Sequence, residues 1–120
     1  MDHATVQTWL DRYIDAWRTY DEQAIGDLFS EDATYRYHRW DEPVRGREAI
    51  VKDWLANPDA PGTWSAQYTP YAVEDAKAVA VGMSSYKDAT TDSVFHNVFL
   101  LEFAPDGRVD SFEEVYAKER

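Results

Sequence analysis

The chain has 120 residues, 44% hydrophobic and 15% aromatic, which predicts one domain over residues 1–120 with enough apolar surface for a single core. Its formal net charge of −11 argues against binding to nucleic acid or to an anionic membrane, because both need a basic surface. Because it has no cysteine, disulfides, a thiolate nucleophile and sulfur-ligated zinc are excluded.

The first 30 residues read as two helices. Apolar side chains recur at steps of three and four from Val6 to Tyr20, which predicts an amphipathic helix of about five turns. Asp21 is a suitable N-terminal cap for a second helix. We expect the buried side chains of that helix to be Ala24, Ile25, Leu28 and Phe29.

One aromatic strand comes between the second helix and a third. Residues 34–40 are β-branched and aromatic, which predicts a strand with Tyr35 and Tyr37 on one face. Arg36 and His38 then take the other face. Residues 41–46 read as a loop.

A third helix is predicted over residues 47–56, and Asn57-Pro58 stops it. Its inward side chains should be Ala49, Ile50 and Trp54.

From residue 63 the apolar period changes to two, which predicts strands over residues 63–73, 78–87, 93–103 and 108–117. Turn signals over residues 74–77, 88–92 and 104–107 separate them, and Asp106-Gly107 is the strongest of these. Pro70 predicts an edge strand or a bulge. Three helices with one strand among them, followed by sequential strands, predict an α+β domain with a mostly antiparallel sheet.

Five segments stand out together: Tyr13-Ile14-Asp15-Ala16-Trp17, Asp21, Leu28 to Thr34, Pro43 to Ile50, and Phe103 to Val109. In this order they resemble the NTF2-like superfamily and, within it, the SnoaL-like proteins. The resemblance implies an NTF2-like cone: three N-terminal helices packed on a strongly curved, mostly antiparallel sheet, with a pocket open at one end. It also implies a homodimer formed through the sheet. Because the superfamily includes isomerases, polyketide cyclases, dehydratases, epoxide hydrolases and non-catalytic binders, it does not select a reaction.

The resemblance places Tyr13 where ketosteroid isomerases keep the tyrosine that stabilises an oxyanion. The isomerase general-base aspartate aligns with Tyr37 here, and the second oxyanion aspartate aligns with Phe99. Isomerase activity by that mechanism is therefore not expected, because a phenol with a pKa near ~10 is a poor base at neutral pH. The alternative for Tyr13 is a purely structural place in the aromatic stripe of its helix.

Glu114 is the candidate replacement for the missing carboxylates. Alternation places Phe112, Glu114 and Tyr116 on one face of the last strand. If Phe112 faces the cavity, so does Glu114, and desolvation would raise its pKa into the range that suits acid–base chemistry. The opposite register would leave Glu114 in solvent.

The histidines and the acidic loop are weaker candidates. By alternation His38 and His96 lie on the outer face of the sheet, where an outward histidine could belong to a dimer interface. The alternative is that they face the pocket, and for His38 a bulge near the strand end would allow this. Asp41 and Glu42, beside Trp40, form an acidic loop at the expected mouth of the cone, either solvated or orienting a ligand. No His-x-x-x-His spacing occurs, so no metal site is expected.

The sequence therefore predicts an aromatic pocket for a small apolar or aromatic molecule, without a cofactor. Tyr13 and Glu114 are the catalytic candidates. The ligand-binding candidates are Trp17, Tyr35, Tyr37, Trp54, Asn97, Phe99, Phe112 and Tyr116. One hypothesis is a cyclase, isomerase, dehydratase or hydrolase in which Glu114 transfers a proton and Tyr13 donates a hydrogen bond. The other is a non-catalytic module that binds a ligand or only dimerises.

The N-terminal segment Met1-Asp2-His3-Ala4 lacks the charged and apolar pattern of a secretory leader, and no long apolar run occurs. We therefore expect a soluble cytoplasmic protein.

Overall fold

The computed structural model describes residues 1–87 and 92–120. Within these ranges the helices are α1 (His3–Thr19), α2 (Glu22–Gly26) and α3 (Arg47–Ala56). The strands are β1 (Phe29–Arg36), β2 (Val44–Arg45), β3 (Trp64–Glu74), β4 (Lys77–Lys87), β5 (Asp92–Phe103) and β6 (Val109–Lys118). The predicted turn over residues 88–92 lies, except for Asp92, outside the described residues.

The strands form one curved sheet in the order β2-β1-β6-β5-β4-β3. Only β1 and β6 run parallel, and every other described neighbour pair is antiparallel. This confirms the predicted α+β class with a mostly antiparallel sheet. The four later strands fall within one residue of their predicted bounds, because strict alternation and clear turn residues fix them.

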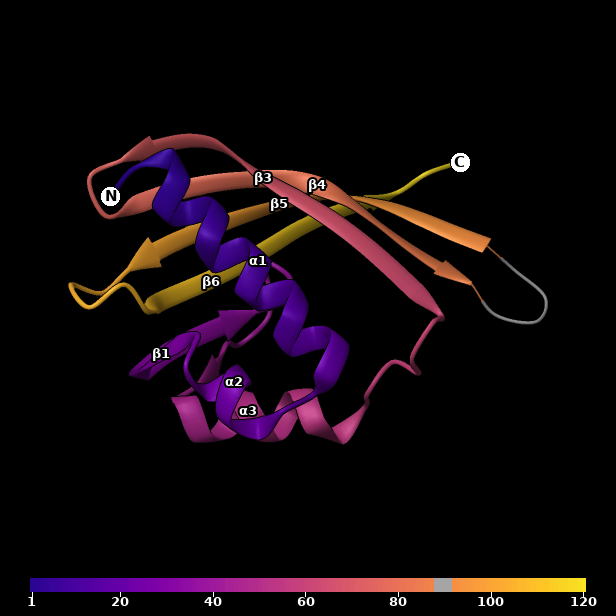
Figure 1. Cartoon of the computed structure of the whole chain (residues 1–120), viewed down its shortest axis with the longest axis horizontal. Coiled ribbons are helices and arrows are strands. Elements are labelled where there is room, and N and C mark those ends of the chain that lie inside the picture. Colours follow the sequence, from indigo (N-terminus) through magenta and orange to yellow (C-terminus); the bar gives the residue numbers. More distant parts are fainter. Residues whose placement is uncertain (88–91) are drawn as a thin grey trace.

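Helix α1 lies across one face of the sheet (Figure 1). β3 and β4 lie on one side of this helix, and β1, α2 and α3 lie on the other. Asp2 caps α1 by accepting a hydrogen bond from the backbone of Thr5. Its buried side chains include Trp9 and Tyr13, which pack against rings from the sheet. The apolar stripe of α1 therefore forms the centre of the core.

Helix α2 is shorter than predicted. It ends at Gly26, and Phe29 begins β1 instead of completing the helix. The carbonyl of Leu28 accepts hydrogen bonds from the Trp9 indole at 3.0 Å and from the Val109 backbone at 2.9 Å. Because this carbonyl serves two distant donors, the chain leaves the helix here, and Leu28 and Phe29 reach the core from an extended segment.

The next elements also differ from the prediction. β1 ends at Arg36, before the end of the predicted strand. A turn follows, in which the Asp41 amide donates a hydrogen bond to the His38 carbonyl at 3.0 Å. The predicted loop contains the short strand β2. In α3 the buried face is Ile50, Val51 and Trp54, whereas Ala49 is exposed, so the helix is rotated from the predicted inward face.

Gly82 allows β3 and β4 to lie unusually close together. A Cβ atom at this position would lie 2.0 Å from the Gln67 carbonyl oxygen and 2.5 Å from the Tyr68 ring, so only glycine allows β3 to approach β4 this closely. Pro70 lies on this edge strand, beside a register shift between Pro70 and Ala72, as predicted. Tyr68, the partner of Gly82 in this pairing, lines the cavity described below.

Candidate functional site

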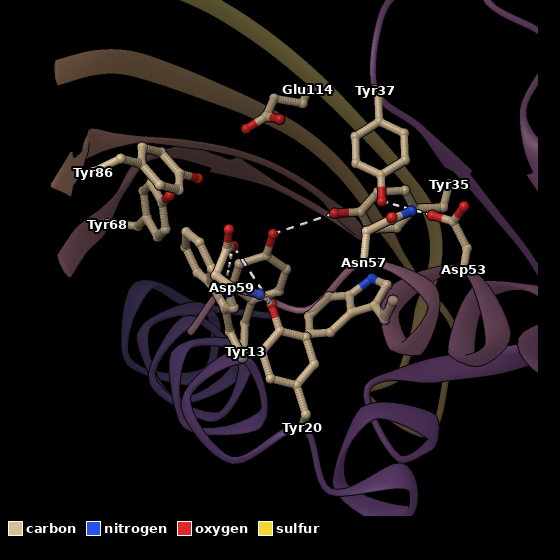
Figure 2. Close-up of a pocket in the computed structure, with 12 residues that line it drawn as sticks. Tyr13, Tyr20, Tyr35, Tyr37, Asp53, Asn57, Asp59, Tyr68, Tyr86 and Glu114 are labelled. Carbon is tan, nitrogen blue, oxygen red and sulfur yellow. Dashed lines mark hydrogen bonds between the residues drawn. The ribbon is translucent and has the colours of Figure 1, made fainter. Parts of the chain in front are cut away.

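A cavity of about 330 Å³ lies between the concave face of the sheet and the helices (Figure 2). Helix α1 and its C-cap supply Tyr13, Trp17 and Tyr20. The segment from β1 onward supplies Tyr35 and Tyr37, and α3 with the chain after it supplies Asp53, Trp54, Asn57 and Asp59. The later strands supply Tyr68, Tyr86 and Glu114. Segments far apart in the sequence thus contribute to one aromatic and acidic lining.

A pair of buried phenols marks the inner part of the cavity. The hydroxyls of Tyr13 and Tyr35 lie 3.2 Å apart, and the two side chains are 6% and 3% exposed. Tyr35 stacks on Phe112 with ring centroids 4.3 Å apart. Burial raises the pKa of both phenols well above the usual range, so both are neutral. Because the pair shares one hydrogen bond between two O–H groups, one proton remains available for a third group.

Glu114 is a carboxyl group in the wall of the cavity. Burial raises the pKa of Glu114 to about 7, and a hydrogen bond from Asn97 opposes this shift. The Asn97 amide nitrogen donates to the Glu114 carboxylate at 3.1 Å. The amide oxygen accepts from the Ser84 hydroxyl at 3.0 Å, which orients the Asn97 nitrogen toward Glu114. Figure 2 shows the carboxyl pointing into the cavity among the tyrosines.

Two further carboxylates accept hydrogen bonds from aromatic side chains of the wall. The hydroxyl of Tyr37, a residue that is 39% exposed, donates to Asp53 at 2.6 Å. Asp59 accepts from the Trp17 indole at 2.9 Å, and its own amide donates to the Tyr20 hydroxyl at 2.8 Å. The two bonds of Asp59 hold the segment after α3 against the end of α1, and the Tyr37 bond ties the segment after β1 to α3.

Comparison with known proteins agrees with this architecture. A family model described as a SnoaL-like domain matches residues 10–112. The chain belongs to the SnoaL-like family.

Among solved structures, this SnoaL-like chain is similar to an NTF-2 like protein of unknown function from Burkholderia xenovorans LB400. The two are 17% identical with a TM-score of 0.73, over 98% of this chain and 86% of the other. At this identity the likeness establishes the NTF2-like fold alone. No curated protein matched the chain.

In this SnoaL-like protein the cavity brings together many of the residues singled out from the sequence. Tyr13, Trp17, Tyr35, Tyr37, Trp54 and Glu114 all line it. Asn97 is buried and reaches the site through its hydrogen bond to Glu114. Phe99 and Phe112 lie behind the wall, where they pack against Tyr13.

Tyr116 and the histidines lie elsewhere. Tyr116 is 43% exposed, and its hydroxyl lies 3.0 Å from Nε2 of His38, because β6 continues past the cavity. His96 lies 3.1 Å from the carboxylate of Glu119 at the surface. Trp40 is 82% exposed beside its acidic neighbours. None of these side chains lines the described cavity.

Sequence reasoning missed part of the lining, namely Tyr20, Asp53, Asn57, Asp59, Tyr68 and Tyr86. The alternation in β3 that contains Trp64 and Tyr68 was a usable signal, as was the helical spacing of Asp53 and Asn57. Asp59 carried no such signal, because it follows Pro58 in an irregular segment and reaches the cavity only through the folded chain.

Residues 1–87 and 92–120 contain neither a cluster of metal ligands nor a membrane-spanning helix. No group of three or more histidine, aspartate or glutamate side chains is arranged to hold a metal ion. In the same ranges, no helix has both the length and the apolar character that a membrane crossing needs.

Proposed function

We propose that this SnoaL-like protein is a cofactor-independent enzyme that transfers a proton on a small, mostly apolar substrate. Glu114 is the proton-transfer group, and Tyr13 is the hydrogen-bond donor. The observation that carries the proposal is the carboxyl of Glu114 in the wall of an aromatic cavity, with its pKa raised to about 7. A group with this pKa is present in both protonation states near neutral pH, as general acid–base catalysis requires.

The chemistry follows from the arrangement of the two groups. The Glu114 carboxylate removes a proton from a substrate carbon next to an electron-withdrawing group. Negative charge then develops on a substrate oxygen, which the free O–H of the Tyr13 and Tyr35 pair stabilises. Protonated Glu114 returns the proton to another atom of the substrate, which completes an isomerisation or an elimination.

The proton-transfer role can be tested with a general probe of base catalysis, without knowing the natural substrate. In 5-nitrobenzisoxazole, a base removes the ring C–H proton, the electron pair forms a nitrile and the N–O bond breaks to give a coloured phenolate. The ring fits an aromatic pocket, and the phenolate oxygen needs a hydrogen-bond donor. We expect turnover on the order of 100-fold faster for the natural protein than for Glu114→Gln. The rate should rise with pH through an apparent pKa near that of Glu114, about 7.

The matched control is Glu74→Gln, which removes a carboxylate outside the cavity lining and should leave the rate unchanged. Tyr13→Phe should slow the reaction less than Glu114→Gln, because Tyr35 retains a phenol at the same place. Equal rates for the natural protein and Glu114→Gln would overturn the catalytic proposal.

A non-catalytic binding module is the second candidate. It is favoured by Tyr37 and Phe99, which occupy the positions where related isomerases keep carboxylates. In that case calorimetry would show aromatic ligands binding in the cavity. The natural protein and Glu114→Gln would both give only the uncatalysed rate of proton transfer.

We also propose that the protein is cytoplasmic. A further proposal is that it forms a homodimer through the outer face of the sheet. Val81, Val98 and Val115 lie side by side in adjacent strands, on the face opposite Phe99 and Glu114. Burying such a stripe would stabilise a dimer. Light scattering should give twice the mass of one chain, and Val98→Glu should halve it. An unchanged mass would contradict this interface.

A further inference from the structure

The charges that line the cavity are all of one sign. Glu114, Asp53 and Asp59 contribute carboxyl groups, and no lysine, arginine or histidine is found among the described lining residues. In the described part of the chain no salt bridge joins any of these carboxyls to a basic side chain. Their hydrogen-bond partners are neutral groups of asparagine, tyrosine and tryptophan. The cavity therefore holds negative charge that the fold does not neutralise.

The rest of the lining consists of tyrosines and tryptophans, apart from Asn57. Burial is the main cause of the raised pKa of Tyr13, Tyr68 and Tyr86, and the negative charge of Glu114 adds to the rise in all three. The charge of Glu114 therefore acts on tyrosines from α1, β3 and β4. Aromatic faces attract cations and not anions, and this attraction grows when the site excludes water.

Trp54 gives an independent indication of a ligand. Its side chain lines the cavity and the residue is 8% exposed, yet its indole Nε1 has no hydrogen-bond partner among the described residues. A buried N–H without a partner is costly, so a bound molecule with an oxygen acceptor would relieve this cost.

We propose that the cavity selects a cationic amine: a small aromatic or apolar molecule that carries a positively charged nitrogen and an oxygen acceptor. The nitrogen lies among the carboxylates and aromatic rings, and the oxygen accepts from a donor such as the Trp54 indole. The inference rests on the proposed function, since it names the substrate class of the same cavity. The overall charge of −11 would also speed the approach of a cation.

Three ligands of similar shape test the charge preference. They are (4-hydroxymethylphenyl)trimethylammonium, its neutral isostere 4-tert-butylbenzyl alcohol, and the anion 4-(hydroxymethyl)benzoate. We expect calorimetry at pH 8.5 and low salt to show the cation binding on the order of tenfold more tightly than the neutral isostere. The anion should bind most weakly. Equal or tighter binding of the neutral isostere, or no binding of the cation, would overturn the inference.

Isosteric variants locate the preference within the cavity. Glu114→Gln and Asp59→Asn remove a charge but keep an oxygen that can accept the same hydrogen bonds. Each should reduce the advantage of the cation over its isostere severalfold, whereas Glu74→Gln, with the same change in net charge, should not. An equal reduction by all three variants would indicate an effect of net charge and contradict the inference.

The two proposals fail separately. Turnover of 5-nitrobenzisoxazole that depends on Glu114, together with no preference for the cation, would retain the acid–base role and remove the ligand class. A preference for the cation without turnover would favour the binding module.

Discussion

The side-chain amide of Asn97 donates a 3.1 Å hydrogen bond to the carboxylate of Glu114, while its oxygen accepts from Ser84 at 3.0 Å. β5 and β6 place these two residues on the same face of the sheet, with Asn97 almost fully buried. The contact stabilises the charged form of Glu114, and burial stabilises the neutral form. Because the two effects oppose each other, the pKa of Glu114 is about 7.

Removing this hydrogen bond should raise the pKa of Glu114. We expect Asn97→Leu to move it above about 7, since desolvation remains and the stabilising donor is lost. Carbon-13 NMR of the labelled glutamate carboxyl measures the titration. Ser84→Ala is the control, because it leaves the Asn97 donor in place and should shift the midpoint less. A lowered pKa in Asn97→Leu would contradict the assignment.

The same carboxyl predicts a pH dependence of stability. The folded pKa of Glu114, about 7, lies above its usual value of 4.5, so folding favours the protonated form. Its contribution to stability is fully present below about pH 4.5 and is lost as pH rises through 7. Relative to Glu114→Gln, the natural protein should therefore lose on the order of 3 kcal/mol between pH 4 and pH 8.5. Urea unfolding of both proteins across this range measures the difference, and a constant difference would refute the buried carboxyl.

Gly82 should be indispensable for the close pairing of β3 with β4. We expect Gly82→Ala to destabilise the protein by about 2 kcal/mol or more, because the added methyl would meet the backbone of β3. Gly26→Ala is the control, since its methyl would have ordinary contacts of 3.7 and 3.8 Å and favour helix α2. Thermal unfolding compares the two. Similar melting temperatures for both variants would show that β3 can move away at little cost.

Asp59 should matter as a hydrogen-bond acceptor for the wall of the cavity. Asp59→Ala leaves the Trp17 indole without its partner, which should cost about 1 to 3 kcal/mol. Asp59→Asn keeps an acceptor oxygen and should cost clearly less. Denaturant unfolding measures both values. A larger loss for Asp59→Asn would mean that the charge, and not the acceptor, stabilises this segment.

Local patterns decided much of the fold. The apolar spacing from Val6 to Tyr20 predicted α1, and alternation predicted the four later strands, because these periods reflect the geometry of a single element. The same alternation placed Phe112 and Glu114 on one face of β6. The change from helix to strand before Phe29 was not predictable, because it depends on hydrogen bonds from the distant donors Trp9 and Val109.

The composition and periodicity of the sequence by themselves determined the α+β class, the helix-to-strand order and the candidate carboxyl of the last strand. Only the tertiary structure decided what surrounds that carboxyl. Asp53 and Asp59, from α3 and the irregular segment after it, meet Tyr68 from β3 in one lining, and Gly82 permits the close approach that places Tyr68 there. The reason is physical: a pKa and a cavity charge arise from desolvation and from neighbours in space, and neither quantity is encoded in the local spacing of residues.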